Sequence, residues 1–430
     1  KKAIPGKIHP YQQIIDEIRE ILVNLGFIEE KGPLVELNFW NCDTLFMPSD
    51  HPARSIHDIF ELKFPSEGKI IDKKLWERVK KTHLNGWKTG SKGWGGWDFE
   101  LAKKLILRGV LSQPDIFDSM VAWGSKFQKI FTRPVSENIG TSCARLVSPL
   151  LRNRHFKPLS PVAFHRMIPY LNTERGRSGI KVALYVGCLI DKIFPDIARD
   201  VIDVLNHHGV GIFMPEGQGC CGIPALSSGD TQTFNRLLRH NLELFDAEKF
   251  DFLVTSCATC TSTIKEIWPM MADKDSGYVK SRVHIIAQKT MDINQFLVSK
   301  VGLENVKFDN SVEPVIATYH DPCHLKKTLG VFSEPRSLIK ANPGYQLKEM
   351  PESDRCCGLG GNFNLQYYEL STNIGKLKLE NITASGCQVV ATGCPACMLQ
   401  FFDMLSKSGD NIRVKHPVEI YAELLRKYPD

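Results

Sequence analysis

Two copies of one cysteine pattern constrain this chain more than any other feature of its sequence. Each copy has a single cysteine, then an adjacent cysteine pair followed by glycine, then C-x2-C, in the form C-x31/32-CC-x35/36-C-x2-C. The cysteines of the second copy follow their counterparts by 135 to 137 residues, which indicates one structural unit used twice. The ten residues are Cys188, Cys220, Cys221, Cys257, Cys260, Cys323, Cys356, Cys357, Cys394 and Cys397.

The segments between these cysteines predict alternating strands and helices. "KVALYVGC" and "PVIATYHDPC" are apolar, β-branched runs that end in a cysteine, which is typical of buried strands. "IFPDIARDVIDVLNHHGV" has apolar residues at helical spacing. Strands that alternate with helices indicate parallel sheets with both faces covered. All motif cysteines would then lie at the carboxyl ends of strands, where open α/β sheets form their sites.

The expected fold class is therefore α/β, with two tandem, pseudo-symmetric Rossmann-like modules. We place the first module at residues 181–315 and the second at 316–430. Residues 110–180 are expected to form a helical connector, and residues 1–109 a separate N-terminal α/β segment.

The residue types favour a metal centre in each module. Thiolates are the ligands that iron–sulfur clusters use, and five sulfurs exceed the four of a structural zinc site. Each C-x2-C is expected to open a helix, whose N-terminal N–H groups would stabilise thiolates. Gly222 and Gly358 are expected to let the backbone approach a cluster closely. A thioredoxin-like pair or structural zinc would explain each C-x2-C, but neither would explain the cysteine pairs.

Composition adds limits on location and partners. Thirteen cysteines, an odd number, without a secretory signal favour metal or redox chemistry over a disulfide framework. A net charge of +6 gives no reason to expect nucleic acid, and no apolar run is long enough to cross a bilayer. We expect a cytoplasmic protein, either free or peripheral on the cytoplasmic face of a membrane complex. Cys42, Cys143 and Cys387 are interpreted as buried structural residues.

Residues from about 110 to 430 resemble the iron–sulfur subunits with cysteine-rich CCG domains, on the strength of both complete motifs and the segment "PLSPVAFHR". That family includes a cysteine-rich component of heterodisulfide reductase and the iron–sulfur subunits of glycolate and lactate oxidation. The resemblance implies one cluster per motif. In the best understood relative these are non-cubane [4Fe–4S] clusters, and in others zinc can occupy one copy. His320 and His324, beside Cys323, are interpreted as outer-shell or structural residues.

The resemblance also implies partners. An FAD-binding subunit that oxidises a 2-hydroxy acid would supply electrons, and a disulfide, quinone or carrier protein would accept them. Many members carry a ferredoxin domain with two C-x2-C-x2-C-x3-C-P runs, and this sequence has no such run. A ferredoxin-type iron–sulfur protein is therefore an expected second partner. The residues suggest no catalytic acid or base.

Residues 1–109 resemble a truncated archaeal-type phenylalanyl-tRNA synthetase α chain. The likeness covers the first dimer-interface motif around Pro33 and the stretch from His51 to Arg54, and then stops after Arg108. Without the later motifs no complete site for ATP and phenylalanine is expected, so no aminoacylation is predicted. Two alternatives to an electron-transfer subunit therefore remain: a zinc-stabilised scaffold without redox activity, and an inactive synthetase fragment.

Overall fold

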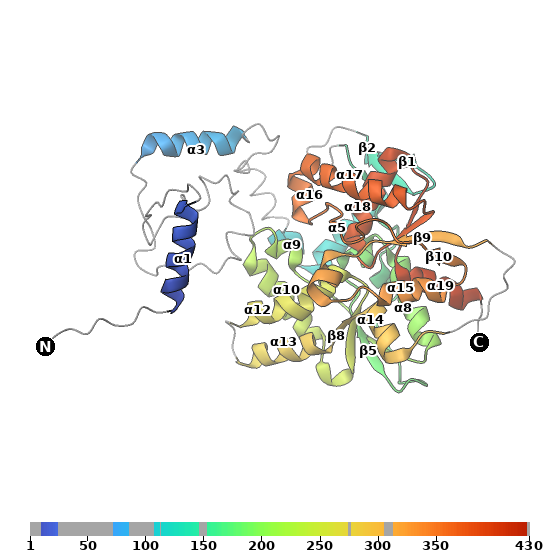
Figure 1. Ribbon diagram of the computed structural model, residues 1–430. Helices are drawn as coiled ribbons and strands as arrows, with labels where there is room; N and C mark the ends of the chain where they lie inside the picture. The colour runs from blue at the N-terminus through green and yellow to red at the C-terminus, as the bar shows by residue number, and fades with distance from the viewer. Residues whose placement is uncertain are drawn as a thin grey trace.

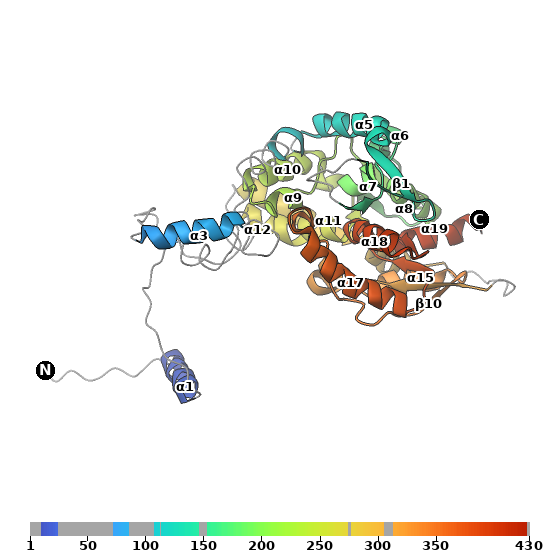
Figure 2. The ribbon, with the colours of Figure 1, turned by 90° about the horizontal axis from the view of Figure 1, so that it is seen from above.

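The computed structural model describes residues 10–24, 72–85, 107–111, 113–145, 153–273, 277–304 and 313–427. The described part of the N-terminal segment includes helix α1 (Pro10–Asn24). It stands apart from the body that carries the sheets in both views, and helix α3 (Lys73–Asn85) is separated from that body in Figure 1 (Figures 1 and 2). The synthetase-like motifs around Pro33 and at 51–54 lie outside the described residues.

The first module is built on a five-stranded sheet in the order β4-β6-β5-β7-β8. Four of its strands are parallel, and β4 pairs with β6 in the antiparallel sense at the edge. The parallel strands are β5 (Lys181–Leu184), β6 (Gly211–Met214), β7 (Phe252–Thr255) and β8 (Thr290–Asp292), and the edge strand is β4 (Leu171–Asn172).

The second module repeats this arrangement. Its parallel sheet has the order β10-β9-β11-β12, so each strand occupies the place of its counterpart in the first module. The strands are β9 (Val315–Tyr319), β10 (Tyr345–Leu347), β11 (Val389–Ala391) and β12 (Arg413–Lys415). The predicted fold class, two Rossmann-like α/β modules with parallel sheets, is confirmed.

Helices connect the strands within each module, as the alternating pattern requires. In the first module they are α7 (Cys188–Lys192), α8 (Pro195–His207), α9 (Ile223–Leu226), α10 (Thr231–Leu244), η4 (Ala247–Lys249), α11 (Ala258–Ser262), η5 (Thr263–Ile267), α12 (Trp268–Ala272), α13 (Gly277–Lys289), α14 (Ile293–Phe296) and η6 (Leu297–Val301). In the second they are η7 (His324–Thr328), α15 (Glu334–Ala341), α16 (Asn362–Gln366), α17 (Tyr368–Ala384), α18 (Pro395–Ser408) and α19 (Pro417–Lys427).

The segment expected to be a helical connector is helical only in part. It begins with η3 (Leu107–Leu111) and the long helix α5 (Pro114–Phe131). Three short strands then form an antiparallel sheet: β1 (Thr132–Ser136), β2 (Thr141–Ala144) and β3 (His155–Phe156). Helix α6 (Phe164–Met167) and β4 follow. These strands are too short to show a clear alternation of apolar residues, so they leave little signal in the sequence.

The two modules pack against each other over a continuous apolar core. Helix α19 of the second module contacts both α8 of the first and α15 of its own module. Tyr421 on α19 lies 3.0 Å from Nε2 of His208, and Arg426 pairs with Asp200 on α8. Buried residues of both modules belong to the same hydrophobic cluster. None of the described helices combines the length and the apolar character that a membrane span requires.

Candidate metal centre

The first cysteine set gathers at the carboxyl edge of the first sheet. Cys188 is the first residue of α7 after β5, the pair Cys220–Cys221 follows β6, and Cys257 precedes α11 after β7. The sulfurs of Cys188 and Cys220 lie 3.7 Å apart. Cys221 in turn contacts Cys260, and Cys260 contacts Cys257. All but the half-buried Cys188 are buried, so these five side chains converge on one protected place.

The second set has the same arrangement with a more open rim. The sulfurs of Cys357 and Cys397 lie 3.3 Å apart, and Cys397 also contacts Cys394. Cys356 contacts its neighbour Cys357 and accepts a hydrogen bond from the Gly358 amide at 3.3 Å. Cys323 lies near Cys357 and Cys394. Cys323 and Cys356 are exposed, whereas the other three are buried.

The two C-x2-C motifs occupy equivalent positions and meet where the modules join. Cys257 and Cys394 are the N-cap residues of α11 and α18, with almost identical backbone angles. The amide of Ala258 donates to the carbonyl of Gly393 at 3.0 Å, and the Cys257 thiol contacts Cys394. The hydroxyl of Thr259 lies 3.4 Å from the Cys394 sulfur. The two cysteine sets are therefore adjacent.

Thiols this close cannot all ionise, and their pKa values separate accordingly. Hydrogen bonds from Cys220 and Cys260 hold the pKa of Cys221 well below its usual value. Contacts with Cys188 and Cys221, together with burial, raise the pKa of Cys220. In the second set, hydrogen bonds from Cys356 and Cys397 lower the pKa of Cys357 in the same way. A bound cation would remove this conflict, because thiolates are the form that metals bind.

The two glycines singled out from the sequence are required, and the structure supplies a reason other than approach to a cluster. Gly222 and Gly358 have φ of 94° and 91°, in the region that favours glycine. A Cβ at Gly222 would lie 2.7 Å from the ring of Phe234 on α10, and one at Gly358 would lie 2.5 Å from the carbonyl oxygen of Ser371 on α17. Gly222 thus lets its cysteine corner pack against α10, and Gly358 lets the other corner pack against α17.

A side chain at Gly187 would press against a motif sulfur. The φ of Gly187 is 77°, and a Cβ there would lie 3.1 Å from Sγ of Cys260. This role was not predicted, although Gly187 directly precedes Cys188 and could have been singled out on that basis.

Buried polar side chains hold the first cysteine corner in place. Nδ2 of Asn241 donates to the Cys220 carbonyl at 3.0 Å, while its Oδ1 accepts from the Gly219 amide at 2.9 Å. Nε1 of Trp268 donates to the Cys221 carbonyl at 3.0 Å. Neither residue was singled out from the sequence, because both lie within ordinary amphipathic helical patterns.

A cavity of about 70 Å³ opens beside Cys188 and Cys220. Its opposite wall carries Asp118, His165 and Asp191. His165 lies with Nε2 3.1 Å from Asp118 and Nδ1 2.9 Å from Asp191, and the buried Lys192 pairs with both carboxylates. Cys188 and Cys220 thus line a cavity together with these charged side chains.

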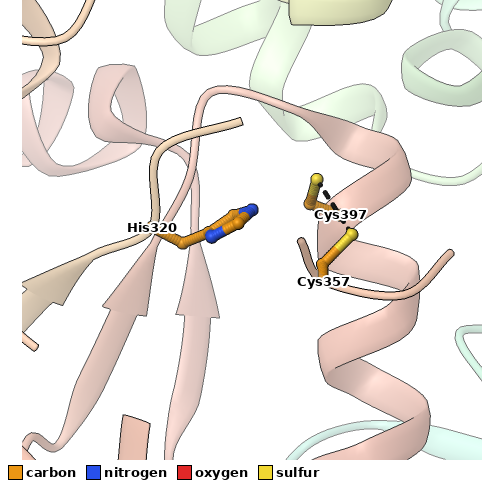
Figure 3. A group of neighbouring side chains, drawn as sticks. All are labelled: His320, Cys357 and Cys397. Atoms are coloured by element: carbon orange, nitrogen blue, oxygen red, sulfur yellow. Dashed lines mark hydrogen bonds between the residues drawn. The ribbon is translucent and has the colours of Figure 1, made fainter. Parts of the chain in front are cut away.

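The residues present fit iron–sulfur clusters. Each set offers five soft donors gathered at the edge of its sheet, and a buried ring nitrogen, Nε2 of His320, has no hydrogen-bond partner among the described residues. Figure 3 shows His320 beside Cys357 and Cys397, which come from the cysteine corner and from α18. Cys143 and Cys387 are buried elsewhere, and Cys42 lies outside the described residues.

Comparison with known families gives two matches. Residues 182–265 and 317–402 each match the family described as "Cysteine-rich domain", designated CCG. Residues 1–117 match the "tRNA synthetases class II core domain (F)". Each CCG match lies within one of the two modules, and together the matches contain all ten motif cysteines.

Curated relatives match the same part of the chain. Lactate utilization protein A 2 of Bacillus cereus is 31% identical over 248 residues, which is 58% of this chain and 100% of that protein. A component of the CoM/CoB fumarate reductase of Methanothermobacter marburgensis is 31% identical over 279 residues, 60% of this chain and 53% of that protein. An uncharacterized iron–sulfur protein of Methanococcus maripaludis is 36% identical over 228 residues, 53% of this chain and 42% of that protein. The chain thus spans about half of these two archaeal relatives.

Proposed function

Because this chain belongs to the CCG cysteine-rich-domain family of iron–sulfur proteins, which includes lactate utilization protein A, we propose that it is an electron-transfer subunit of an oxidoreductase. Each five-cysteine set holds one iron–sulfur cluster, of the [4Fe–4S] type. The observation that carries the proposal is the convergence of each set into one group of sulfurs, in which every cysteine except Cys323 contacts another, with the two groups adjacent at Cys257 and Cys394.

Electrons enter from a partner and leave to an acceptor. The donor is an FAD-binding subunit that oxidises a 2-hydroxy acid, and the acceptor is a disulfide, a quinone or a carrier protein. The names of two relatives support this choice of donor and acceptor, since one refers to lactate utilization and the other to a CoM/CoB fumarate reductase.

Clusters bound here would supply one-electron steps. The chain's own residues would bury the clusters and provide the polar groups next to them. Burial of eight described sulfurs, wholly or in part, keeps water from most of each group. Thr259 lies between the sets, with its hydroxyl against Cys394 and 3.1 Å from Nδ1 of His324. The cavity beside Cys188 admits a small reactant, and His165, held by Asp118 and Asp191, stands at its wall to carry a proton.

An apolar stripe on α5 supports a partner subunit. Side chains at intervals of three and four residues lie on one face of this helix and are exposed, although each is large and apolar. The same helix contributes Phe117 and Asp118 to the cavity beside Cys188. A protein that covers the stripe would therefore lie close to the first cysteine set. The stripe consists of Ile116, Met120, Trp123, Phe127 and Ile130.

The test is an anaerobic reductive titration followed by visible absorbance and EPR, and then reoxidation. We expect dithionite to bleach the protein and produce paramagnetic signals, and a water-soluble quinone or an aromatic disulfide to restore the absorbance in proportion to the electrons removed. A protein that holds zinc at both sites and shows neither bleaching nor signals would contradict the proposal and favour the redox-silent scaffold.

A further inference from the structure

The two modules differ at one buried position beside the sulfurs. Three residues before the first motif cysteine, the first module has Tyr185 and the second has His320. The Tyr185 hydroxyl donates to the carbonyl of Gly219 at 2.7 Å and so is already satisfied. His320 is equally buried, with 1% of its surface exposed. Only the second module therefore places a metal-binding side chain here.

The hydrogen bond of His320 fixes its tautomer. Nδ1 lies 3.1 Å from the carbonyl oxygen of Ser353. A carbonyl only accepts hydrogen bonds, so Nδ1 must carry the proton, and Nε2 then presents a lone pair. Metal-binding histidines are commonly oriented in this way, by a backbone acceptor on the other ring nitrogen. Phe401 packs edge-to-face against the ring, with centroids 5.1 Å apart, and restricts its rotation.

The free lone pair points toward the cysteines. Figure 3 shows the ring nitrogen farther from the backbone directed toward the sulfurs of Cys357 and Cys397. One nitrogen and the two sulfurs all lie within 4.8 Å of one another, close enough to share one metal ion, and all three side chains are buried. Nε2 has no hydrogen-bond partner among the described residues, and a buried polar atom of this kind loses free energy unless something binds it.

We propose that Nε2 of His320 is a ligand of the second centre, together with Cys357, Cys397 and the adjacent Cys394. This inference rests on the proposed function, since it concerns the same centre. The exposed Cys323 and Cys356 remain at the rim of this buried set. Three thiolates and one imidazole suit either a zinc ion, which takes all four, or a [4Fe–4S] cluster, which takes one on each iron. The first centre, by contrast, has thiolates alone.

The mixed donor set of the second centre should give the two centres different reduction potentials. An imidazole is neutral, whereas a thiolate is negative. A centre in which an imidazole replaces a thiolate therefore accepts an electron more readily. If both centres hold iron, the second therefore has the higher reduction potential. Electrons that reach the first centre would then pass toward the second.

Pulsed EPR on reduced protein labelled with ¹⁵N-histidine tests the assignment. We expect a strong nitrogen coupling that changes with the isotope, disappears in His320→Ala and persists in His324→Ala. His324 is the matched control, because it lies nearby but contacts Thr259. If the second site holds zinc, absorption at the zinc edge should show one nitrogen at about 2.0–2.1 Å with sulfurs, again dependent on His320.

A second variant keeps the test decisive if His320→Ala fails to fold. His320→Cys supplies a thiolate in place of the imidazole, and we expect it to retain metal, to lose the nitrogen coupling and, with iron, to have a lower potential. A sulfur-only shell in the wild-type protein, or a nitrogen signal unchanged in either His320 variant, would overturn the inference. Iron at both sites without histidine coupling would refute this inference alone, whereas absence of iron would refute the proposed function.

Discussion

At the scale of single residues, the thiols are the groups on which the proposed function depends. The first set contains one cysteine with a strongly lowered pKa, Cys221, and the second contains two, Cys357 and Cys394, because neighbouring thiols donate to these sulfurs. Such a thiolate is ready to bind metal at neutral pH. Other thiols of the two sets, such as Cys220, Cys260 and Cys397, have raised pKa values and must lose their protons as the metal binds.

Replacement of Cys221 by Ser should remove the first centre. The hydroxyl is a hard, weakly acidic ligand in the middle of a buried thiolate group, so we expect iron and acid-labile sulfide to fall by about half. Cys143→Ser is the matched control, because Cys143 is also buried but lies against Arg133, outside both sets. Equal iron content in wild type and Cys221→Ser would contradict the assignment.

Asp292 should make the protein less stable as the pH rises from about 4 to 7. This carboxyl is fully buried, and burial raises its pKa to about 7. In the unfolded chain the carboxyl ionises near its ordinary value of about 3.9, so within this window the folded state alone keeps the proton. The free energy of unfolding is therefore highest at low pH, falls as the pH rises above about 4, and stops falling once the folded carboxyl also ionises near pH 7.

Asp292→Asn tests this pH dependence. An amide cannot ionise but can still accept from the Asn294 amide, which now donates to Oδ1 at 2.9 Å. We expect the variant to be more stable than wild type at pH 8, by the order of 1–3 kcal/mol, and nearly equal at pH 4.5. Thermal unfolding midpoints of metal-loaded protein at both pH values provide the measurement. An equal difference at the two pH values would show that ionisation of Asp292 is not the cause.

Sequence reasoning found the ten cysteines but not the residues that position them. The cysteines repeat at fixed spacing, whereas Gly187, Asn241 and Trp268 act through contacts between segments distant in the chain. The proposed role of His320 also could not be predicted from the sequence. Its place beside Cys323 suggested a supporting role, and only the free Nε2 and the nearby sulfurs point to ligation.

At the scale of elements, the strands that deliver the cysteines were predictable because they are continuous apolar runs. β5, β7 and β9 are such strands, and the helices after each C-x2-C begin where the motif predicts. Strands β1 to β3 were not predicted, since they are only two to five residues long. Their positions depend on contacts with the second module, such as the hydrogen bond from the His155 amide to Asp403 on α18 at 2.9 Å.

Lys192 should be the residue that holds α5 against α7. It is 5% exposed and pairs with Asp118 on α5 and Asp191 on α7. Lys192→Met keeps the length of the side chain but leaves two carboxylates without their cation. We expect a loss of roughly 1–3 kcal/mol, below the full effect of a buried pair because Asp118 is partly exposed. Arg199→Ala, which removes an exposed pair with Asp196, should change thermal stability little, and equal effects of the two variants would contradict this role.

At the scale of the whole molecule, the two modules form one apolar core and place their cysteine sets side by side. The repeat predicted two similar units but could not predict how they pack, because the contacts of α19 with α8 join residues more than two hundred positions apart. The boundary between residues 315 and 316 remains a prediction.

The stripe on α5 should be needed for assembly and not for folding. Trp123 is 63% exposed, so Trp123→Glu should leave the thermal midpoint nearly unchanged. We expect it to abolish co-purification of flavoprotein or ferredoxin-type subunits, identified by mass spectrometry, from the native cell. Tyr278→Glu is the control, because Tyr278 is as exposed but lies on α13. Recovery of the same subunits with wild type and Trp123→Glu would argue against the stripe as their contact surface.

The iron and acid-labile sulfide content of protein purified without oxygen decides whether the two cysteine sets are redox centres. Two [4Fe–4S] clusters predict a brown protein with about eight iron atoms and about eight sulfides per chain. A colourless protein with stoichiometric zinc and no sulfide would contradict the proposal that each group of five sulfurs holds an iron–sulfur cluster.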